Sequence, residues 1–238
     1  DSFSITPGNT VEANVTLEMI VSVSDIDNDV LSIQYSWLNN GGQSLGTGST
    51  LTLNSSYAVG STITAIATLT DAYGATDANN QVINILNTDP QVGNGALITA
   101  TPSAVTGGLL SCTASFTDFN DGALGSSYTW TSGNTTIASG NTYTIDPNDV
   151  SPTDVIQCQA SATDSNGATV TSVASISVQN TPPSVNSVTI SPTIAYVDST
   201  ITCGYVASDV DSGESQTASF SWSRNGISEG GTSSTYVG

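Results

Sequence analysis

Apolar residues occupy every second position in many short segments of this 238-residue chain, and such alternation predicts half-buried β-strands. Around Cys112, the residues Leu110, Ala114 and Phe116 share its parity, and polar residues lie between them. The segment around Cys158 alternates in the same way. We therefore expect both sulfur atoms to point into one core.

Trp130 lies between these two cysteines, inside a third alternating segment. Two cysteines with a tryptophan between them are typical of an immunoglobulin-type sandwich, in which strands B and F carry the cysteines and strand C carries the tryptophan. A bridge between Cys112 and Cys158 closes a loop of 158 − 112 = 46 residues. The chain-entropy model assigns such a loop about 4 kcal/mol of stabilisation. The pattern thus predicts a disulfide within the core of this sandwich.

The spacing of this unit recurs nearer the start of the chain. Met19 lies 18 residues before Trp37 (37 − 19 = 18), which equals the separation of Cys112 and Trp130 (130 − 112 = 18). A third copy carries Trp222. Because the three tryptophans share the parity of nearby apolar residues, we expect Trp37, Trp130 and Trp222 to pack in cores rather than to form surface platforms for sugar rings.

The spacing along strand F is the same in the first two copies, although the first copy lacks both cysteines. Ala65 lies six residues before Asp71, as Cys158 lies six residues before Asp164. We therefore expect a Met19/Ala65 pair in place of the disulfide. The conserved spacing without the sulfur atoms indicates tandem copies of one unit.

Two proline-containing linkers divide the chain into its copies. They read Asn-Thr-Asp-Pro at 87–90 and Asn-Thr-Pro-Pro at 180–183, and their prolines should keep them short and extended. The expected fold class is all-β, with tandem immunoglobulin-like β-sandwiches at 1–88 (without a disulfide), 89–181 (with the Cys112–Cys158 disulfide) and 182–238 (partial).

The third copy follows the pattern only through strands A to about E. Its last residues, 235–238, correspond to 142–145 of the second copy. Strands F and G are therefore missing from the pattern, and with them the expected partner of Cys203. A sandwich without two central strands would expose half of its core. Either the chain is an excerpt of a longer repeat protein, or a neighbouring molecule donates the missing strand.

The charge of the chain excludes several classes of function. Lys and Arg together number 1, Asp and Glu number 20, and the formal net charge is −19. Nucleic acids and anionic membranes need clustered cations, so neither is an expected partner. With 0 histidines, a Ser-His-Asp or Cys-His arrangement cannot form. The carboxylates lie in loops rather than in a cleft, so we expect no enzyme activity.

Three features of the sequence concern its compartment. No run of about 20 apolar residues is present that could span a membrane. No signal peptide opens the sequence, so Asp1 is not expected to be the first residue translated. The cysteine framework implies an oxidising compartment, which means the extracellular space or the cell surface.

Several short motifs of the third copy together resemble a known family. They are Asn-Thr-Pro-Pro-Ser-Val at 180–185, Ile-Ser-Pro at 190–192, Thr-Ile-Thr-Cys at 200–203, Asp-Val-Asp at 209–211 and Ser-Trp at 221–222. These motifs are similar to those of tandem immunoglobulin-like (cadherin-like or PKD-like) repeats in long secreted and cell-surface proteins of bacteria and some archaea. The resemblance covers essentially the whole chain. It implies a stalk, adhesin or spacer, and in some cadherin-like relatives calcium at the joints between repeats.

The B–C loop of every copy is acidic, and in an immunoglobulin-type sandwich this loop meets the F–G loop at the end where the preceding linker arrives. Six to eight hard oxygens suit calcium, and softer metals lack suitable ligands here. The candidate calcium ligands are Asp25, Asp27, Asp29, Asp71, Asn87, Asp89, Asp118, Asn120, Asp121, Asp164, Asp209, Asp211 and Glu214. The alternative is turn chemistry, in which Asp and Asn side chains accept hydrogen bonds from nearby backbone N–H groups.

These observations favour a structural function. We expect a non-catalytic repeat segment of an extracellular filament, stalk or adhesin, with calcium stiffening the joints and with neighbouring repeats or copies of itself as partners. The alternatives are a spacer or a carbohydrate- or protein-binding module of a secreted enzyme, and a filament subunit that exchanges strands. A binding module would need an exposed row of aromatic residues, which the parity of the tryptophans does not supply.

Overall fold

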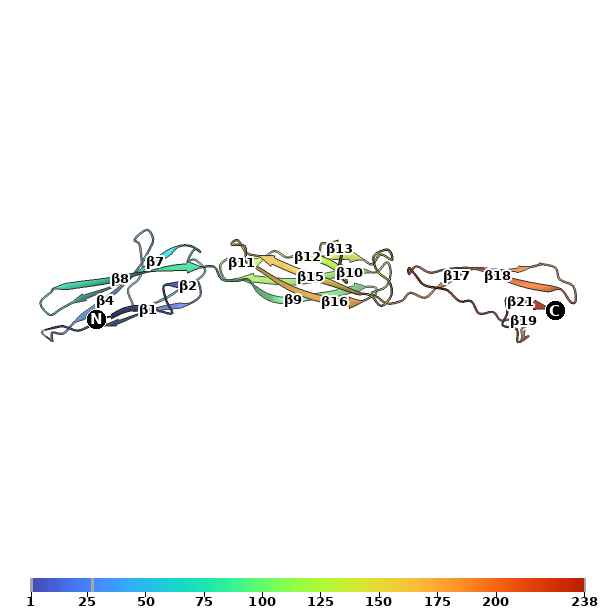
Figure 1. Ribbon diagram of the computed structural model, residues 1–238, viewed down its shortest axis with the longest axis horizontal. Helices are drawn as coiled ribbons and strands as arrows, with labels where there is room; N and C mark the ends of the chain where they lie inside the picture. Colours follow the sequence, from blue (N-terminus) through green and yellow to red (C-terminus); the bar gives the residue numbers. More distant parts are fainter. Residues whose placement is uncertain (1, 27, 238) are drawn as a thin grey trace. The chain divides into compact units, whose positions relative to one another are not determined.

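The computed structural model describes residues 2–26 and 28–237, and its regular structure consists of β-strands alone (Figure 1). No helix occurs in these ranges. The all-β class expected from the alternation is thus confirmed. A helix that is long and apolar enough to cross a membrane is accordingly absent from the described residues.

Two compact units make up the chain, and the boundary between them crosses strands of the second sandwich. The first unit contains the residues up to 95 together with 114–127 and 161–172, and the second contains 96–113, 128–160 and the residues from 173 onward. The domain limits expected at 88/89 and 181/182 stay a prediction.

The first sandwich lies in the first unit and consists of two sheets. The smaller sheet has the order β1 (Ser2–Thr6), β3 (Thr16–Ser22) and β6 (Thr50–Thr52). The larger sheet has the order β2 (Thr10–Glu12), β8 (Thr76–Leu86), β7 (Thr62–Thr70), β4 (Ser32–Asn39) and β5 (Ser44–Gly46). Neighbouring strands are antiparallel except for β2 and β8, which are parallel. Buried residues of both sheets form one core.

Trp37 lies within this core. Its side chain is fully buried, and its indole N–H donates a hydrogen bond of 2.8 Å to the carbonyl oxygen of Gly48. The register of β4 and β7 places Trp37 opposite Ala65, and Met19 of β3 is buried in the same core. The Met19/Ala65 pair therefore contributes apolar packing at the positions where the second sandwich has cysteines.

The second sandwich also has two sheets. In one, β10 (Leu109–Asp118) pairs with β9 (Gln91–Thr101), β11 (Gly122–Leu124) and β14 (Thr142–Thr144). The other has the order β13 (Thr135–Ser139), β12 (Ser127–Ser132), β15 (Val155–Thr163) and β16 (Thr169–Ser177). The structure contains a disulfide between Cys112 of β10 and Cys158 of β15, and both residues are fully buried. The bridge therefore ties one sheet to the other.

The third copy contains one sheet and one hairpin. The sheet has the order β17 (Ser184–Ser191), β18 (Thr200–Ser208) and β21 (Thr235–Val237), and the hairpin consists of β19 (Ser223–Arg224) and β20 (Ile227–Ser228). Trp222 stacks on Tyr236 with 5.5 Å between the ring centroids. No strand in the described part of this copy takes the place that β7 and β15 hold in the other two.

One backbone hydrogen bond occurs at the same position in all three copies. The donor is the strand B residue that corresponds to Cys112, and the acceptor is the carbonyl oxygen just before the short strand that pairs with strand B. The pairs are Met19 with Ser49, Cys112 with Asn141 and Cys203 with Ser234, each at 2.8 Å. This shared register supports three copies of one structural unit.

Replacing Cys112 and Cys158 together by alanine tests the role of the disulfide. We expect the free energy of unfolding of the second sandwich to fall by about 2 to 5 kcal/mol, because the unfolded chain regains the freedom of its closed loop. Hydrogen exchange read by mass spectrometry follows both sandwiches at once. The first sandwich, with its Met19/Ala65 pair, serves as the internal reference.

Cys203→Ser is the matched control, because Cys203 is the free cysteine of the described chain. This variant should leave exchange in the second sandwich unchanged. Equal exchange in the wild type and in the Cys112→Ala/Cys158→Ala variant would show that the bridge does not stabilise this core.

Candidate functional site

The first linker is hydrogen-bonded to the B–C loop of the second sandwich, within the first unit. The backbone N–H of Thr88 donates to the Oδ1 atom of Asn120 at 3.0 Å, and the Thr88 hydroxyl donates to the same oxygen. Thr88 is buried although it lies in a linker. The backbone of the linker is thus fixed by a side chain of the following loop.

Asp118 shapes the loop that presents Asn120. Its Oδ1 atom accepts hydrogen bonds from the N–H groups of Asn120 at 2.7 Å and Asp121 at 2.9 Å, in a turn that begins at the end of β10. The carboxylate of Asp121 accepts from the N–H and the hydroxyl of Ser165 at 2.8 and 2.9 Å. Asp121 therefore joins the B–C loop to the F–G loop.

Asn87 and Asp164 form a second contact between the linker and the sandwich. The Nδ2 atom of Asn87 donates to Oδ2 of Asp164 at 2.6 Å, and Oδ1 of Asp164 accepts from the N–H groups of Asn166 and Ala168. The hydrogen bond from Asn87 is the main reason that the pKa of the Asp164 carboxyl lies below its ordinary value of 3.8. The N–H groups of the turn lower the pKa further.

Some polar atoms at the first linker are buried without a hydrogen-bond partner. They include two acceptors, Oδ2 of Asp118 and Oδ1 of Asn87, and one donor, Nδ2 of Asn120. Asp118 is 5% exposed, so water reaches its carboxylate poorly. A buried carboxylate oxygen without a partner is costly, and a bound cation would remove that cost. The two unpartnered oxygens are compatible with a bound cation, whereas the Asn120 donor is not explained by one.

The second linker repeats this arrangement within the second unit. The N–H of Thr181 donates to Oδ2 of Asp211 at 2.6 Å, and the N–H of Asp211 donates to Oδ1 of Asp209 at 2.9 Å. Asp209 and Asp211 thus correspond to Asp118 and Asn120. The Oδ2 atom of Asp209 is buried without a partner, as Oδ2 of Asp118 is.

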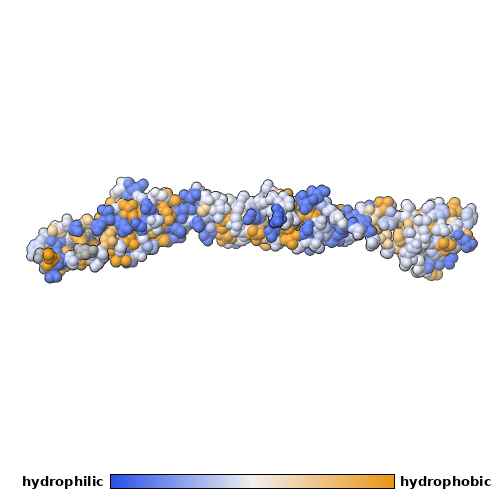
Figure 2. Space-filling model, viewed as in Figure 1, coloured by the Kyte–Doolittle hydropathy of each residue, from blue (hydrophilic) through white to orange (hydrophobic). Residues whose placement is uncertain are grey.

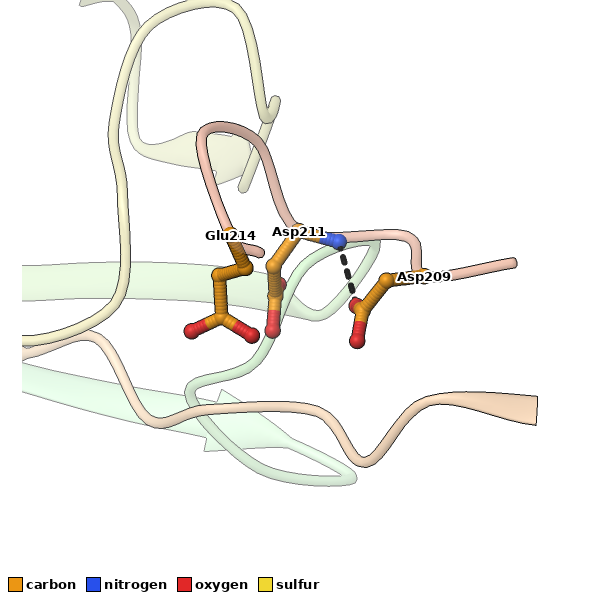
Figure 3. Close-up of side chains that lie close together, drawn as sticks. All are labelled: Asp209, Asp211 and Glu214. Carbon is orange, nitrogen blue, oxygen red and sulfur yellow. Dashed lines mark hydrogen bonds between the residues drawn. The ribbon is translucent and has the colours of Figure 1, made fainter. Parts of the chain in front are cut away.

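A cluster of three carboxylates distinguishes the second linker from the first. One carboxylate oxygen from each of Asp209, Asp211 and Glu214 lies within 4.8 Å of the others, and Figure 3 shows the three groups directed to the same side of the loop. Asp211 also accepts a hydrogen bond from the Thr106 hydroxyl. The amide of Asn180 donates to Glu214 at 2.6 and 3.1 Å in the orientation that satisfies both groups. Linker and loop therefore meet at concentrated negative charge.

Two of the acidic residues of the first copy, Asp25 and Asp71, act as turn acceptors, and Asp29 takes part as a backbone donor. The Oδ1 atom of Asp25 accepts the N–H of Asp29 at 3.2 Å, and Oδ1 of Asp71 accepts two N–H groups of its own turn at 2.8 Å each. Asp27 lies outside the described residues. Among the residues described, the only group of three acidic side chains that lie this close together is the cluster at the second linker.

The structure thus brings part of the expected calcium ligand set together. Asn87, Asp118, Asn120 and Asp164 gather around the first linker, and Asp209, Asp211 and Glu214 gather at the second. Asp121 is engaged by Ser165, and Asp89 is exposed. The assignment of calcium to these residues stays a prediction.

The two linker threonines and Thr106 are contact residues that the sequence pattern did not predict. Thr88 and Thr181 act through their backbone N–H groups, which residue type does not reveal. The recurrence of an Asn-Thr dipeptide at 87–88 and 180–181 was the signal that could have found them. Thr106 offered no comparable signal, because its contact with Asp211 joins residues far apart in the sequence.

Comparisons with known proteins give only distant structural likenesses. No protein-family model and no curated protein matches the chain. The three N-terminal domains of the bacteriophage RB49 highly immunogenic outer capsid protein match at 16% identity and a TM-score of 0.30, over 93% of this chain and 73% of that one. A bacterial ice-binding adhesin matches at 16% identity and a TM-score of 0.31, over 87% and 75%.

A third likeness is to extracellular cadherin domains of protocadherin gamma B2, at 14% identity and a TM-score of 0.31, over 89% of this chain and 61% of that one. The assignment of this chain to the all-β class rests on the strand topology described above.

Asn120→Ala tests whether the loop holds the first linker. The N–H of Thr88 loses its acceptor, so we expect its amide hydrogen to exchange about 2- to 10-fold faster, while the amide of Thr181 keeps its rate. Nuclear magnetic resonance resolves the two amides. Asp121→Ala is the control, because its carboxylate accepts from Ser165 rather than from the linker. The same acceleration in both variants would contradict a specific contact.

Asn87→Ala tests the cause of the lowered pKa of Asp164. We expect this pKa to return toward its ordinary value of 3.8, because the amide donor is gone. In the wild type, the lowered pKa means that ionised Asp164 favours the folded state above about pH 4, and this contribution is lost as the pH falls through the folded-state pKa. A carboxyl-carbon titration by nuclear magnetic resonance measures the shift.

Asn80→Ala is the matched control for this titration, because Asn80 is an exposed asparagine of β8 away from the linker. It should leave the pKa of Asp164 at its wild-type value. An unchanged pKa in Asn87→Ala would show that the turn N–H groups alone set it.

Proposed function

We propose that the chain is a non-catalytic structural repeat segment of an extracellular filament, stalk or adhesin, with calcium bound where each linker meets the following sandwich. The observation that carries this proposal is the repeated docking of a linker. Thr88 and Thr181 donate their N–H groups to Asn120 and Asp211, which occupy equivalent positions in successive copies. A chain that builds the same joint twice is suited to positioning successive domains.

The chemistry of the buried oxygens supports calcium as the ion. Calcium takes six to eight oxygen ligands from carboxylates, amide and backbone carbonyl groups and water. At the first linker, Asp118 and Asn87 each present a buried oxygen without a donor. At the second, Asp209 presents such an oxygen beside Asp211 and Glu214. The ion would neutralise these carboxylates, which belong to the B–C loops that contact the linkers.

The charge and covalent structure support an extracellular, non-catalytic role. The net charge of −19 and the 0 histidines argue against nucleic-acid binding and against general-base catalysis. A buried disulfide is typical of secreted and cell-surface proteins. We infer neighbouring repeats or further copies of the chain as its partners.

A carbohydrate-binding module is less well supported. Trp37 and Trp130 are fully buried and donate their indole N–H groups to backbone carbonyl oxygens at 2.8 Å. Their rings therefore cannot stack on a sugar.

Asp118→Asn and Asp209→Asn separate the two proposed calcium sites. We expect calcium to slow amide exchange at Thr88 and Thr181 in the wild type, since the ion would tie each loop to its linker. Each variant should weaken calcium binding at its own linker by at least about tenfold, because one ionic ligand is lost. Calorimetric titration with calcium gives the affinities, and hydrogen exchange assigns each effect to a linker.

Glu18→Gln is the matched control, because Glu18 is an exposed carboxylate of β3 that lies in neither linker region. Calcium affinity should be the same as in the wild type. If calcium leaves both amides unchanged, or if all three variants behave alike, the proposed calcium sites are wrong, whereas the structural role would still stand on the linker hydrogen bonds.

A further inference from the structure

The turn after β6 carries a sequence motif that the structural function does not use. Asn54, Ser55 and Ser56 form an Asn-x-Ser sequon, the acceptor motif for N-linked glycosylation, and all three are exposed. The motif recurs as Asn-x-Thr at 14–16 and 134–136, again with an exposed asparagine. Exposure alone does not distinguish the three sequons, since hydrophilic residues lie at many places on the face in view in Figure 2.

Hydrogen bonds within the sequon distinguish Asn54. The backbone N–H of Ser56 donates to the Oδ1 atom of Asn54 at 2.9 Å, and the Ser56 hydroxyl donates to the same oxygen at 2.6 Å. The N–H of Tyr57 donates to the backbone carbonyl oxygen of Asn54 at 3.1 Å, which closes the turn. The amide oxygen of Asn54 therefore receives two donors from within its own sequon.

These two donors bear on the reactivity of the amide nitrogen. An amide nitrogen is a poor nucleophile because its lone pair is delocalised into the carbonyl group. It becomes nucleophilic as it gives up a proton, and the negative charge then builds on the amide oxygen. Donors that already point at this oxygen stabilise that charge. The turn thus prepares Nδ2 of Asn54 to form a bond.

The third residue of each of the other two sequons is engaged differently. The Thr16 hydroxyl shares a hydrogen bond of 2.9 Å with the Thr52 hydroxyl, across β3 and β6. Thr136 lies in β13 and pairs with Thr131 of β12. Among the hydrogen bonds of the described residues, a sequon hydroxyl donates to its own asparagine only at Asn54.

The turn at Asn54 depends on local contacts alone. Its hydrogen bonds join residues two or three positions apart, whereas Thr16 and Thr52 are 36 positions apart. Local hydrogen bonds from serine and asparagine side chains form without the rest of a fold. The geometry is therefore accessible to a chain that is still unfolded during export, as well as to the folded sandwich.

We propose that Asn54 is an N-glycosylation site, modified during export by an oligosaccharide donor with a lipid pyrophosphate leaving group. Nδ2 forms a bond to the anomeric carbon of the first sugar, and the bond from that carbon to the pyrophosphate oxygen breaks. The pyrophosphate leaves with the electron pair, and a proton of Nδ2 passes to a base of the transferase. No oxidant or reductant is needed. The modification adds a bulky, hydrated group to the first sandwich and goes beyond the structural function.

The charge pattern favours Asn54 over Asn14 as the acceptor. Residues 30–70 contain no charged side chain, although the net charge of the chain is −19. Asn14, in contrast, lies between Glu12 and Glu18. A pyrophosphate donor is anionic, so carboxylates near the acceptor repel it. We therefore expect Asn14 to be the poorer site.

Secretion of the whole chain from a host that performs N-glycosylation tests the proposal. Mass spectrometry of glycopeptides gives the occupied fraction of each sequon. A glycosidase that leaves aspartate in place of each modified asparagine identifies the attachment point. We expect a glycan on Asn54, and we expect Asn54→Gln to lose this glycan while the occupancy of the other two sequons stays at its wild-type value.

The double variant Thr16→Ser/Thr136→Ser is the matched comparison, because all three sequons then end in serine. We expect Asn54 to be occupied at least about threefold more than Asn14 or Asn134 in this variant, since only its amide oxygen accepts the hydroxyl of its own sequon. Equal or higher occupancy at either of the other asparagines would overturn the proposal, because the internal hydrogen bonds would then not select the site.

The disulfide in the same sample separates this proposal from the question of compartment. A Cys112–Cys158 bridge in the secreted chain shows that it passed through an oxidising compartment. If chains with this bridge carry an unmodified Asn54, the glycosylation site is wrong, whereas the structural function would still stand on the linker hydrogen bonds.

Discussion

The burial of one tryptophan in each of the first two sandwiches is the constraint on which the rest of their structure depends. Trp37 and Trp130 are fully buried in their cores, and each indole N–H donates a hydrogen bond to a backbone carbonyl oxygen, which favours one orientation of the ring. This fixes strand C against strand F and the short strand near strand B.

Much of the fold could be predicted from the sequence because burial in a half-buried strand has a period of two. The parity of Leu110, Cys112 and Phe116 predicted which side chains lie in the core, and the equal spacing from Met19 to Trp37 predicted the first copy. The division of the chain into compact units could not be predicted in this way. It depends on packing between strands that are distant in the sequence.

The candidate site could be predicted only in part. The carboxylate of an acidic loop residue can accept hydrogen bonds within its own turn, accept them from a neighbouring loop, or coordinate an ion, and the sequence does not distinguish these roles. Asp121 and Asp118 are close in sequence, yet one accepts from Ser165 and the other keeps a buried oxygen without a donor. The distinction depends on where the linker lies. The linker itself is held through backbone N–H groups, which every residue except proline possesses.

The covalent difference between the first two sandwiches has a mechanical consequence. When a chain is pulled from its ends, the residues enclosed by a disulfide cannot extend. The bridge from Cys112 to Cys158 encloses a separation of 46 residues, which withholds roughly 160 Å of extended chain at about 3.5 Å per residue. The first sandwich has Met19 and Ala65 instead and can extend along its whole length. Under tension the two domains would therefore lengthen by very different amounts, and reduction would abolish the difference.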